Sequence, residues 1–272
     1  MSGAQRSARR PWGLYVYAGF FLLFLYGPVL LLPLFSLSDG TTIAFPIRGF
    51  TLRWYRDLTA DEQLFVSLGN SLRIALAVAA AATILGVMGA WALTRYRFRG
   101  RRPVIAFMML PLIVPGLVLA VSLLLLTHQL GIEPSLACIA FGQLLLCLPF
   151  ATLVMMSRFQ GVDRSLEEAS RDLGVGPTAT FFRVVLPIAW PGVLSSLLMT
   201  FTISFDEFIL ALFLSGSQTT LPVYMWGQLR FPGKLPSVLA LATLILLFSF
   251  AVVTLAERVR RLGWQYRPGA PI

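Results

Sequence analysis

Six long apolar stretches alternate with shorter polar segments along this 272-residue chain. Each is close to or above the roughly 20 residues that a helix needs to cross a hydrocarbon core of about 30 Å. The first is too long, and its end too poor a cleavage site, for a signal peptide, so we expect it to be retained. The pattern predicts six transmembrane helices, at residues 12–37, 72–94, 104–129, 135–156, 188–214 and 237–255.

The composition supports this assignment. Hydrophobic residues make up 57% of the chain and charged residues 12%, whereas soluble domains are about 45–50% apolar and about 25% charged. A soluble fold could not bury so much apolar surface, so the bilayer acts as the solvent. The net charge of +10 could indicate nucleic-acid binding, but most arginines flank apolar stretches, which is typical of membrane proteins. We expect an all-α polytopic protein with a single transmembrane domain over residues 1–272, and no nucleic-acid partner.

The basic residues also predict an orientation. Sixteen of the 22 lie in the N-terminal segment, the loops after the second and fourth stretches, and the C-terminal segment; the other six lie on the opposite side, in the remaining loops or at the start of the second stretch. Because cytoplasmic loops are enriched in Lys and Arg, we expect both termini in the cytoplasm of a bacterial cell, with the chain in the inner membrane. The sixteen are Arg6, Arg9, Arg10, Arg95, Arg97, Arg99, Arg101, Arg102, Arg158, Arg164, Arg171, Arg183, Arg258, Arg260, Arg261 and Arg267.

Two loops are long enough to have structure of their own. The periplasmic loop, at about 38–70, contains Trp54-Tyr55 and mixed charge, which predict a short amphipathic cap at the membrane surface. The cytoplasmic loop, at about 157–187, predicts two short helices. Asp163 is a good N-cap for the first, and Ser165 with Glu168 has the spacing of a capping box.

Glycine and proline predict how these two short helices are separated. Gly174 is a suitable stop for the first helix. Pro177 occupies a position that is allowed in the first turn of the second. Pro187 is expected to end that second helix, because proline lacks a backbone N–H.

The first short helix has an apolar face formed by Leu166, Ala169 and Leu173. The loop has four acids and four arginines, so its net charge is zero and it is a poor anchor for an anionic lipid surface. A solvated connector between two spans is the simple alternative. A compact, neutral hairpin with an apolar face is better suited to docking against a protein partner.

Within this loop the sequence resembles the coupling loop of ABC importer permeases. The family pattern is Glu-Ala-Ala, three residues, Gly, nine residues, an aliphatic residue, one residue, then Leu-Pro. The resemblance implies that the loop sits in a cleft of an ATPase subunit and transmits its closure to the spans. The matching residues, which become expected coupling residues, are Glu168, Ala169, Ser170, Gly174, Val184, Leu186 and Pro187.

Segments along the rest of the chain are similar to the second permease subunit of spermidine/putrescine importers. These are Phe50–Tyr55, Arg95–Gly100, Ser204–Phe208, Leu221–Tyr224 and Ala240–Thr243. The resemblance implies the type I importer fold and three kinds of partner: a homologous permease, two ATP-binding subunits and a periplasmic binding protein. It implies a polyamine as substrate. ATP and Mg²⁺ would be bound by the partner ATPase, and no cofactor or metal by this chain.

The residues themselves agree that ATP is hydrolysed elsewhere. The only lysine, Lys234, is not followed by Ser or Thr, so the chain lacks a phosphate-binding loop. Asp206 and Glu207 fall inside the predicted fifth span, where an acid costs about 2.5–3.5 kcal/mol on insertion scales and usually faces a polar cavity. With Thr202 nearby, they predict a polar stripe on the substrate pathway. The alternatives are pairing with a base of another subunit, or capping of a broken helix.

Two further positions bear on the substrate. Trp54 could offer an aromatic face to a cation, or could be an interfacial anchor. In polyamine permeases the third span usually has an acid just after a proline, whereas this chain has Pro115-Gly116. That departure weakens the polyamine assignment and leaves the permease assignment intact. Amino-acid-like amines, opines and aminophosphonates are alternative substrates.

Other classes of protein fit less well. The single histidine, His128, has no plausible ligand set, and the adjacent acids Asp206 and Glu207 would point about 100° apart on a helix, so we do not expect an enzyme. An ion-coupled carrier or a channel would usually show internal repeats, and none is clear here. The coupling-loop motif distinguishes the permease from both.

Overall fold

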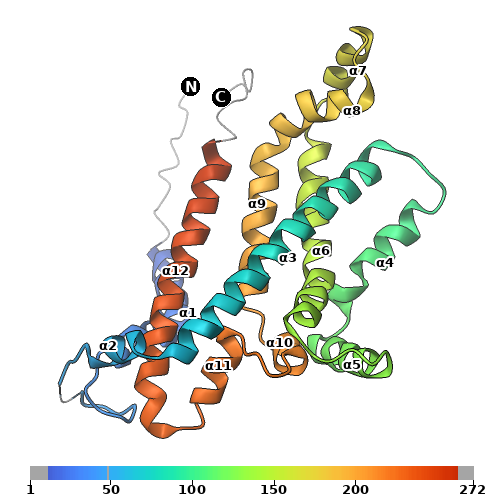
Figure 1. Cartoon of the computed structure of the whole chain (residues 1–272). Helices are drawn as coiled ribbons and strands as arrows, with labels where there is room; N and C mark the ends of the chain where they lie inside the picture. Colours follow the sequence, from blue (N-terminus) through green and yellow to red (C-terminus); the bar gives the residue numbers. More distant parts are fainter. Residues whose placement is uncertain (1–11, 48, 263–272) are drawn as a thin grey trace, which may run out of the picture. The chain divides into compact units, whose positions relative to one another are not determined.

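The computed structural model describes residues 12–47 and 49–262, and within residues 255–262 only the side chain of Arg258. Arg6, Arg9, Arg10, Arg48 and Arg267, which bear on the predicted orientation, lie outside the described residues. The described secondary structure is helical, apart from one isolated bridge between Ser38 and Phe50. The elements are α1 Trp12–Ser36, α2 Arg53–Thr59, α3 Glu62–Arg95, α4 Arg101–Ile113, α5 Gly116–Gln129, α6 Leu136–Gln160, α7 Arg164–Asp172, α8 Pro177–Thr180, the π-helix η1 Phe181–Val185, α9 Leu186–Phe205, α10 Ile209–Leu214, α11 Leu221–Gln228, the 3₁₀-helix η2 Pro232–Lys234 and α12 Leu235–Leu262 (Figure 1).

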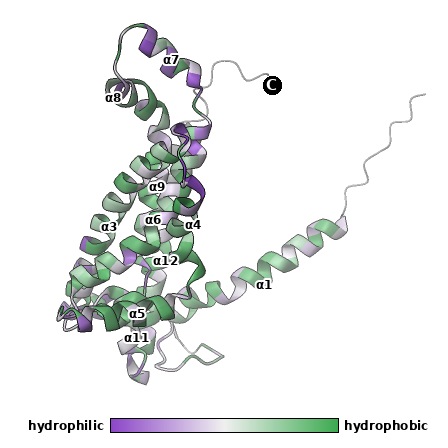
Figure 2. Ribbon diagram, turned by 90° about the vertical axis from the view of Figure 1, so that its right-hand side faces the viewer, coloured by the Kyte–Doolittle hydropathy of each residue, from purple (hydrophilic) through white to green (hydrophobic). Residues whose placement is uncertain are grey.

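Five helical segments in the described chain are long and apolar enough to cross a membrane: Trp12–Ser36, Glu62–Arg95, Leu136–Gln160, Pro177–Phe205 and Pro232–Thr254. A sixth is the bent pair α4 and α5, if the two count as one span. The prediction of an all-α fold with six spans is confirmed on that count. Hydrophobic residues run along α3, α6 and α9, whereas α7 is largely hydrophilic (Figure 2).

The third predicted span, 104–129, is not a single helix. α4 and α5 are bent by 100° at the break between them. Pro115 lies at this break and has no backbone N–H to continue the helix. Val114 before it is extended, with φ −73° and ψ 127°, which is the conformation that proline favours in the preceding residue.

The fifth predicted span, 188–214, differs from the structure at both of its ends, and a break in this helix is one of the alternatives that the sequence left open. Pro187 does not end a helix, because η1 runs directly into α9 and places Pro187 in the first turn. The Leu186 N–H bonds to the Phe181 carbonyl five residues back, and such a wider turn can absorb a proline. At its other end, α9 stops at Phe205, and α10 starts separately at Ile209.

The chain divides into two compact units. The first comprises residues 1–60 and 228–246. In it, the Thr51 N–H bonds to the Leu37 carbonyl at 2.7 Å, and the Ser36 hydroxyl bonds to the Tyr55 hydroxyl at 2.6 Å. The end of α1, the loop and α2 are therefore held together, as expected for a small cap.

The second unit comprises residues 61–227 and 247–272. Its centre is formed by α3, α6 and α9, which pack against one another. The face of α3 in this contact is lined with small, fully buried residues: Ala75, Ala79, Ala82 and Ala90. A Cβ added to Gly86 would lie 2.7 Å from the Cβ of Ala151. Small residues bring helix backbones close together, which is the usual basis of helix packing in a bilayer.

Candidate functional site: the coupling loop and the acidic helix break

The loop that carries the family motif folds locally as the sequence predicts. Asp163 is the N-cap of α7, and its carboxylate accepts the Ser165 N–H at 3.0 Å. This backbone hydrogen bond lowers the pKa of the Asp163 carboxyl. The predicted Ser165/Glu168 capping box is not formed, because Asp163 takes the Ser165 N–H that Glu168 would accept. Gly174 has a φ of +80° after the end of α7, and α8 opens at Pro177.

The two faces of α7 have different environments. Glu167 and Ser170 face the rest of the chain and are buried; the Ser170 hydroxyl bonds to the Thr180 hydroxyl at 3.0 Å. Leu166, Ala169 and Leu173, on the apolar face, are exposed, and Leu173 is 84% exposed. Glu168 is exposed as well. The motif therefore presents Glu168 and Ala169 outward and uses Ser170 to attach α7 to α8.

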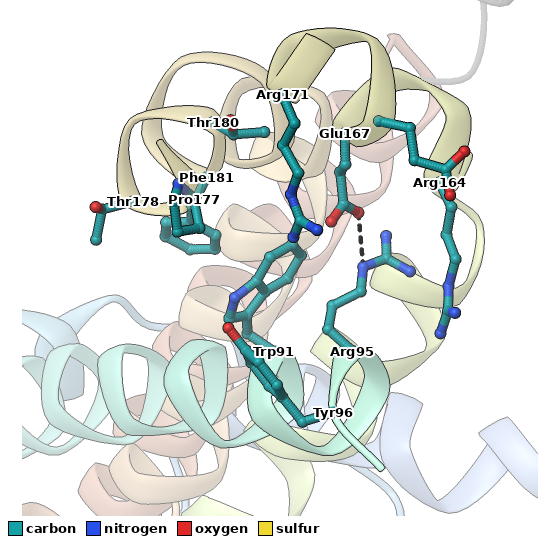
Figure 3. Close-up of a pocket in the computed structure, with 11 residues that line it drawn as sticks. Trp91, Arg95, Tyr96, Arg164, Glu167, Arg171, Pro177, Thr178, Thr180 and Phe181 are labelled. Carbon is teal, nitrogen blue, oxygen red and sulfur yellow. Dashed lines mark ion pairs between the residues drawn. The ribbon is translucent and has the colours of Figure 1, made fainter. Parts of the chain in front are cut away.

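A buried ion pair joins α7 to the end of α3. The Arg95 Nε lies 2.7 Å from a Glu167 carboxylate oxygen, and the two side chains are 10% and 8% exposed. Figure 3 shows them pointing toward each other. Arg95 also donates from Nη2 to the Val162 carbonyl at 3.2 Å, and Arg164 donates to the Thr94 carbonyl at 3.3 Å. The last turn of α3 is thus fastened to both the start and the middle of α7.

Aromatic rings continue this junction. The Arg95 guanidinium lies 5.1 Å from the centre of the Trp91 ring. Trp91 packs on Phe159 of α6 at 5.3 Å and on Phe181 of η1 at 5.0 Å, between ring centroids. A cavity of about 350 Å³ remains between α3 and the loop, open at one side (Figure 3). Its lining comprises Trp91, Arg95, Tyr96, Arg164, Glu167, Glu168, Arg171, Pro177, Thr178, Thr180 and Phe181.

Sequence reasoning did not identify Trp91, Arg95 or Glu167 as part of this site. In the sequence, Arg95 stands out only as a membrane-flanking arginine and as the first residue of the segment Arg95–Gly100, which is similar to polyamine permeases. Glu167 precedes the coupling motif and is not part of it. The available signal was the pair Trp91 and Arg95, four residues apart at the end of an apolar stretch, where an arginine that stacks on a ring can be held in place.

The two acids of the predicted substrate pathway have different environments. Asp206 is the C-cap of α9 and is exposed. Glu207 accepts the Leu210 N–H at 3.0 Å and the Ala211 N–H at 3.1 Å, one with each carboxylate oxygen. Glu207 therefore caps α10, which agrees with the alternative that these acids cap a broken helix. Among the described residues, Asp206 has no salt-bridge partner.

The polar residues around this break are mostly paired. The Thr202 hydroxyl donates to the Leu198 carbonyl at 2.9 Å, within α9. The Ser204 hydroxyl donates to the Gln143 side chain at 2.5 Å, and both residues are buried. A Cβ added to Gly116 would lie 3.8 Å from the Ile209 side chain at the start of α10. The position where polyamine permeases carry an extra acid thus lies beside this break.

Trp54 lies in the first unit and is 4% exposed. Its indole N–H donates to the Ser38 carbonyl at 2.6 Å. The Arg53 guanidinium lies 4.3 Å from the centre of its ring. The ring is therefore already engaged by a cation of the same chain. Coupling roles for the motif residues and pathway roles for Thr202, Asp206, Glu207 and Trp54 stay predictions.

A geometric search of the described residues finds no group of three or more His, Cys, Asp or Glu side chains that could hold a metal ion. Cys138 and Cys147 are free thiols.

Comparison with known proteins identifies the family. Residues 82–262 match the family of binding-protein-dependent transport system inner membrane components. The putrescine transport system permease PotI of Escherichia coli K12 is 36% identical over 247 residues, covering 88% of this chain and 86% of PotI. The spermidine/putrescine permease PotC of Haemophilus influenzae is 34% identical over 239 residues, covering 88% of this chain and 92% of PotC.

Solved structures agree on the fold. A chain of a bacterial ABC transporter that imports the acidic polysaccharide alginate superposes with a TM-score of 0.74 at 21% identity, covering 93% of this chain and 99% of that one. A chain of the methionine transporter MetNI superposes with a TM-score of 0.63 at 17% identity, covering 74% of this chain and 95% of that one. The fold is that of ABC importer membrane subunits, and this chain belongs to the family of binding-protein-dependent transport system inner membrane components.

Proposed function

We propose that this permease subunit forms half of the translocation path of an ABC importer for polyamines such as putrescine and spermidine. The observation that carries the proposal is the position of Asp206. An acid at a helix C-terminus is opposed by the helix dipole, and Asp206 is exposed there. Together with the negative end of the α9 dipole, its carboxylate forms a strongly negative point that attracts an ammonium group.

The relatives support the same substrate class, since PotI and PotC are permeases of putrescine and spermidine systems. A second, homologous permease would supply the other half of the path. A periplasmic binding protein would deliver the substrate, as in the alginate transporter solved in complex with its periplasmic protein.

Energy would come from two ATPase subunits, which bind ATP and Mg²⁺, docked on the exposed face of α7. That face presents the exposed apolar side chains of Leu166, Ala169 and Leu173. In this arrangement the coupling loop faces the cytoplasm, both termini lie on the same side, and Asp206 lies toward the periplasm.

Gly116 favours a second candidate, a substrate with a single positive charge. An acid at this position, beside the start of α10, would provide a second counter-charge for a polyamine, and this chain has none there. The same permease role with an amino-acid-like amine is therefore the runner-up.

The test is substrate-stimulated ATP hydrolysis by the complex purified on this chain, with its binding protein, in lipid nanodiscs. Putrescine, spermidine and a singly charged amine of matched length are compared. Stimulation by the two polyamines supports the proposal, whereas stimulation by the monoamine alone supports the runner-up. Failure of an ATPase subunit to co-purify would refute the importer role itself.

A further inference from the structure

The long helix α3 is fastened by polar contacts at both of its ends. Its 34 residues form one uninterrupted helix, which at 1.5 Å per residue is about 51 Å long. At the end nearer α7, Arg95 is paired with Glu167, as described above. The middle of α3 packs along α6 and α9. This helix contains no proline, so the commonest cause of a sharp kink is absent.

The far end of α3 holds the segment that follows the acidic helix break. The Asn70 side chain donates to the Thr219 carbonyl at 3.0 Å, and the Ser71 hydroxyl accepts the Leu221 N–H at 2.8 Å. Tyr224 donates to the Asp61 carboxylate at 2.5 Å. Residues 219–224 therefore follow α3 if it moves, and they are joined through α10 to Glu207 and Asp206.

Both contacts resist separation. The Arg95–Glu167 pair is about nine-tenths buried, and pulling the two charges apart would leave the Glu167 carboxylate without its ion-pair partner in a poorly solvated place. Asn70 and Ser71 are buried too, at 6% and 3% exposure, so parting them from residues 219–221 would leave unpaired polar groups. When α7 is displaced, breaking these contacts therefore costs more free energy than moving α3 and residues 219–224 along with it.

We propose that α3 is a second route by which the coupling loop drives the acidic helix break, and that Arg95 and Glu167 are its positioning residues. The first route is the covalent one, from α8 through η1 into α9. The second passes from Glu167 to Arg95, along α3, and through Asn70 and Ser71 to residues 219–224. This proposal rests on the proposed function, since it assumes that an ATPase moves α7.

The experiment compares uptake of labelled putrescine per ATP hydrolysed in liposomes containing the complete complex. The main variant is the double substitution Arg95→Met/Glu167→Met, which removes both charges and so leaves no orphaned ion in the protein. The single variants Arg95→Gln and Glu167→Gln accompany it. Asn70→Leu weakens the route at the far end, because it removes the bond to the Thr219 carbonyl. Asp57→Asn is the control, because Asp57 belongs to an exposed pair with Arg53 at 3.9 Å.

We expect the double Met variant and Asn70→Leu to bind the ATPase subunit and hydrolyse ATP, but to transport about tenfold less putrescine per ATP than wild type. Asp57→Asn should match wild type. Wild-type uptake per ATP in a well-assembled double Met variant would overturn the inference. A loss of thermal stability with no change in that ratio would do the same, since it would show a purely structural pair. Absence of ATP-driven uptake in wild type would instead refute the proposed function.

Discussion

Asp206 and Glu207 are adjacent acids, and the structure predicts opposite consequences when each is neutralised. Glu207 accepts two backbone N–H groups at the start of α10. Its replacement by alanine leaves both donors unsatisfied, at about 1–3 kcal/mol in total. Glu207→Gln keeps one acceptor oxygen and should cost about half as much. At about 2–4 °C per kcal/mol for a chain of this size, Glu207→Ala should lower the melting temperature by about 2–12 °C.

Asp206 should behave differently in the same assay. It is an exposed acid at the C-terminus of α9, where the helix dipole disfavours negative charge by about 0.3–1 kcal/mol. Asp206→Asn should therefore leave the melting temperature unchanged or raise it slightly. If Asp206 contacts the substrate, losing a charged hydrogen bond worth about 1.5–3 kcal/mol should reduce uptake at low substrate by about 10- to 100-fold.

The assay is thermal unfolding of the detergent-purified protein, followed by intrinsic fluorescence, alongside uptake by the reconstituted complex. Asp206→Asn and Glu207→Ala serve as controls for each other, since both remove one negative charge at neighbouring positions. The reasoning is refuted if Asp206→Asn destabilises the protein as much as Glu207→Ala, or if Glu207→Gln abolishes uptake while the protein remains fully stable.

Three further predictions concern glycines. Gly174→Val places a β-branched residue at a φ of +80°, which costs about 1–2 kcal/mol locally. The variant should still insert into the membrane, but its ATP-driven uptake should fall. Failure of membrane insertion would count against a coupling role for Gly174. Gly86→Val forces a Cβ to within 2.7 Å of Ala151 and should destabilise the protein by about 1–3 kcal/mol. Gly69→Ala in the same helix is the control and should not destabilise it, because a Cβ there has nothing within 4 Å. Equal melting temperatures for the two variants would refute the close packing at Gly86. Gly116→Asp adds an acid in the first turn of α5, where the helix dipole favours negative charge, and its Cβ meets only an ordinary contact with Ile209. This variant should raise the apparent affinity for spermidine more than the affinity for a monoamine, as measured by competition for uptake.

Much of the fold was predictable because hydrophobicity and charge are read over long windows. The apolar stretches located the spans to within a few residues at most of their ends, and α1 was predicted as 12–37 and found at Trp12–Ser36. The caps of the coupling loop were predictable for a local reason, since Asp163, Gly174 and Pro177 act through the backbone within a few residues of themselves.

The breaks in the spans were harder to predict, because they depend on tertiary partners. Pro33 lies inside α1 and Pro149 inside α6 without ending either helix, whereas Pro115 separates α4 from α5. Proline alone therefore does not decide between a tolerated position and a break. The Arg95–Glu167 pair joins residues 72 positions apart in the sequence, and no local pattern specifies such a contact. Glu207 differs, since its partners lie only three and four residues ahead, and its capping role depends on α9 ending two residues earlier.

The most direct test of the account is ATP-driven uptake of labelled putrescine by liposomes that contain the complex purified on this chain, with its binding protein. Saturable uptake that requires ATP, and that Asp206→Asn reduces by about 10- to 100-fold with ATP hydrolysis retained, is the predicted result. Undiminished uptake in Asp206→Asn would contradict the assigned cation contact, and wild-type complex that hydrolyses ATP without moving putrescine would contradict the polyamine substrate.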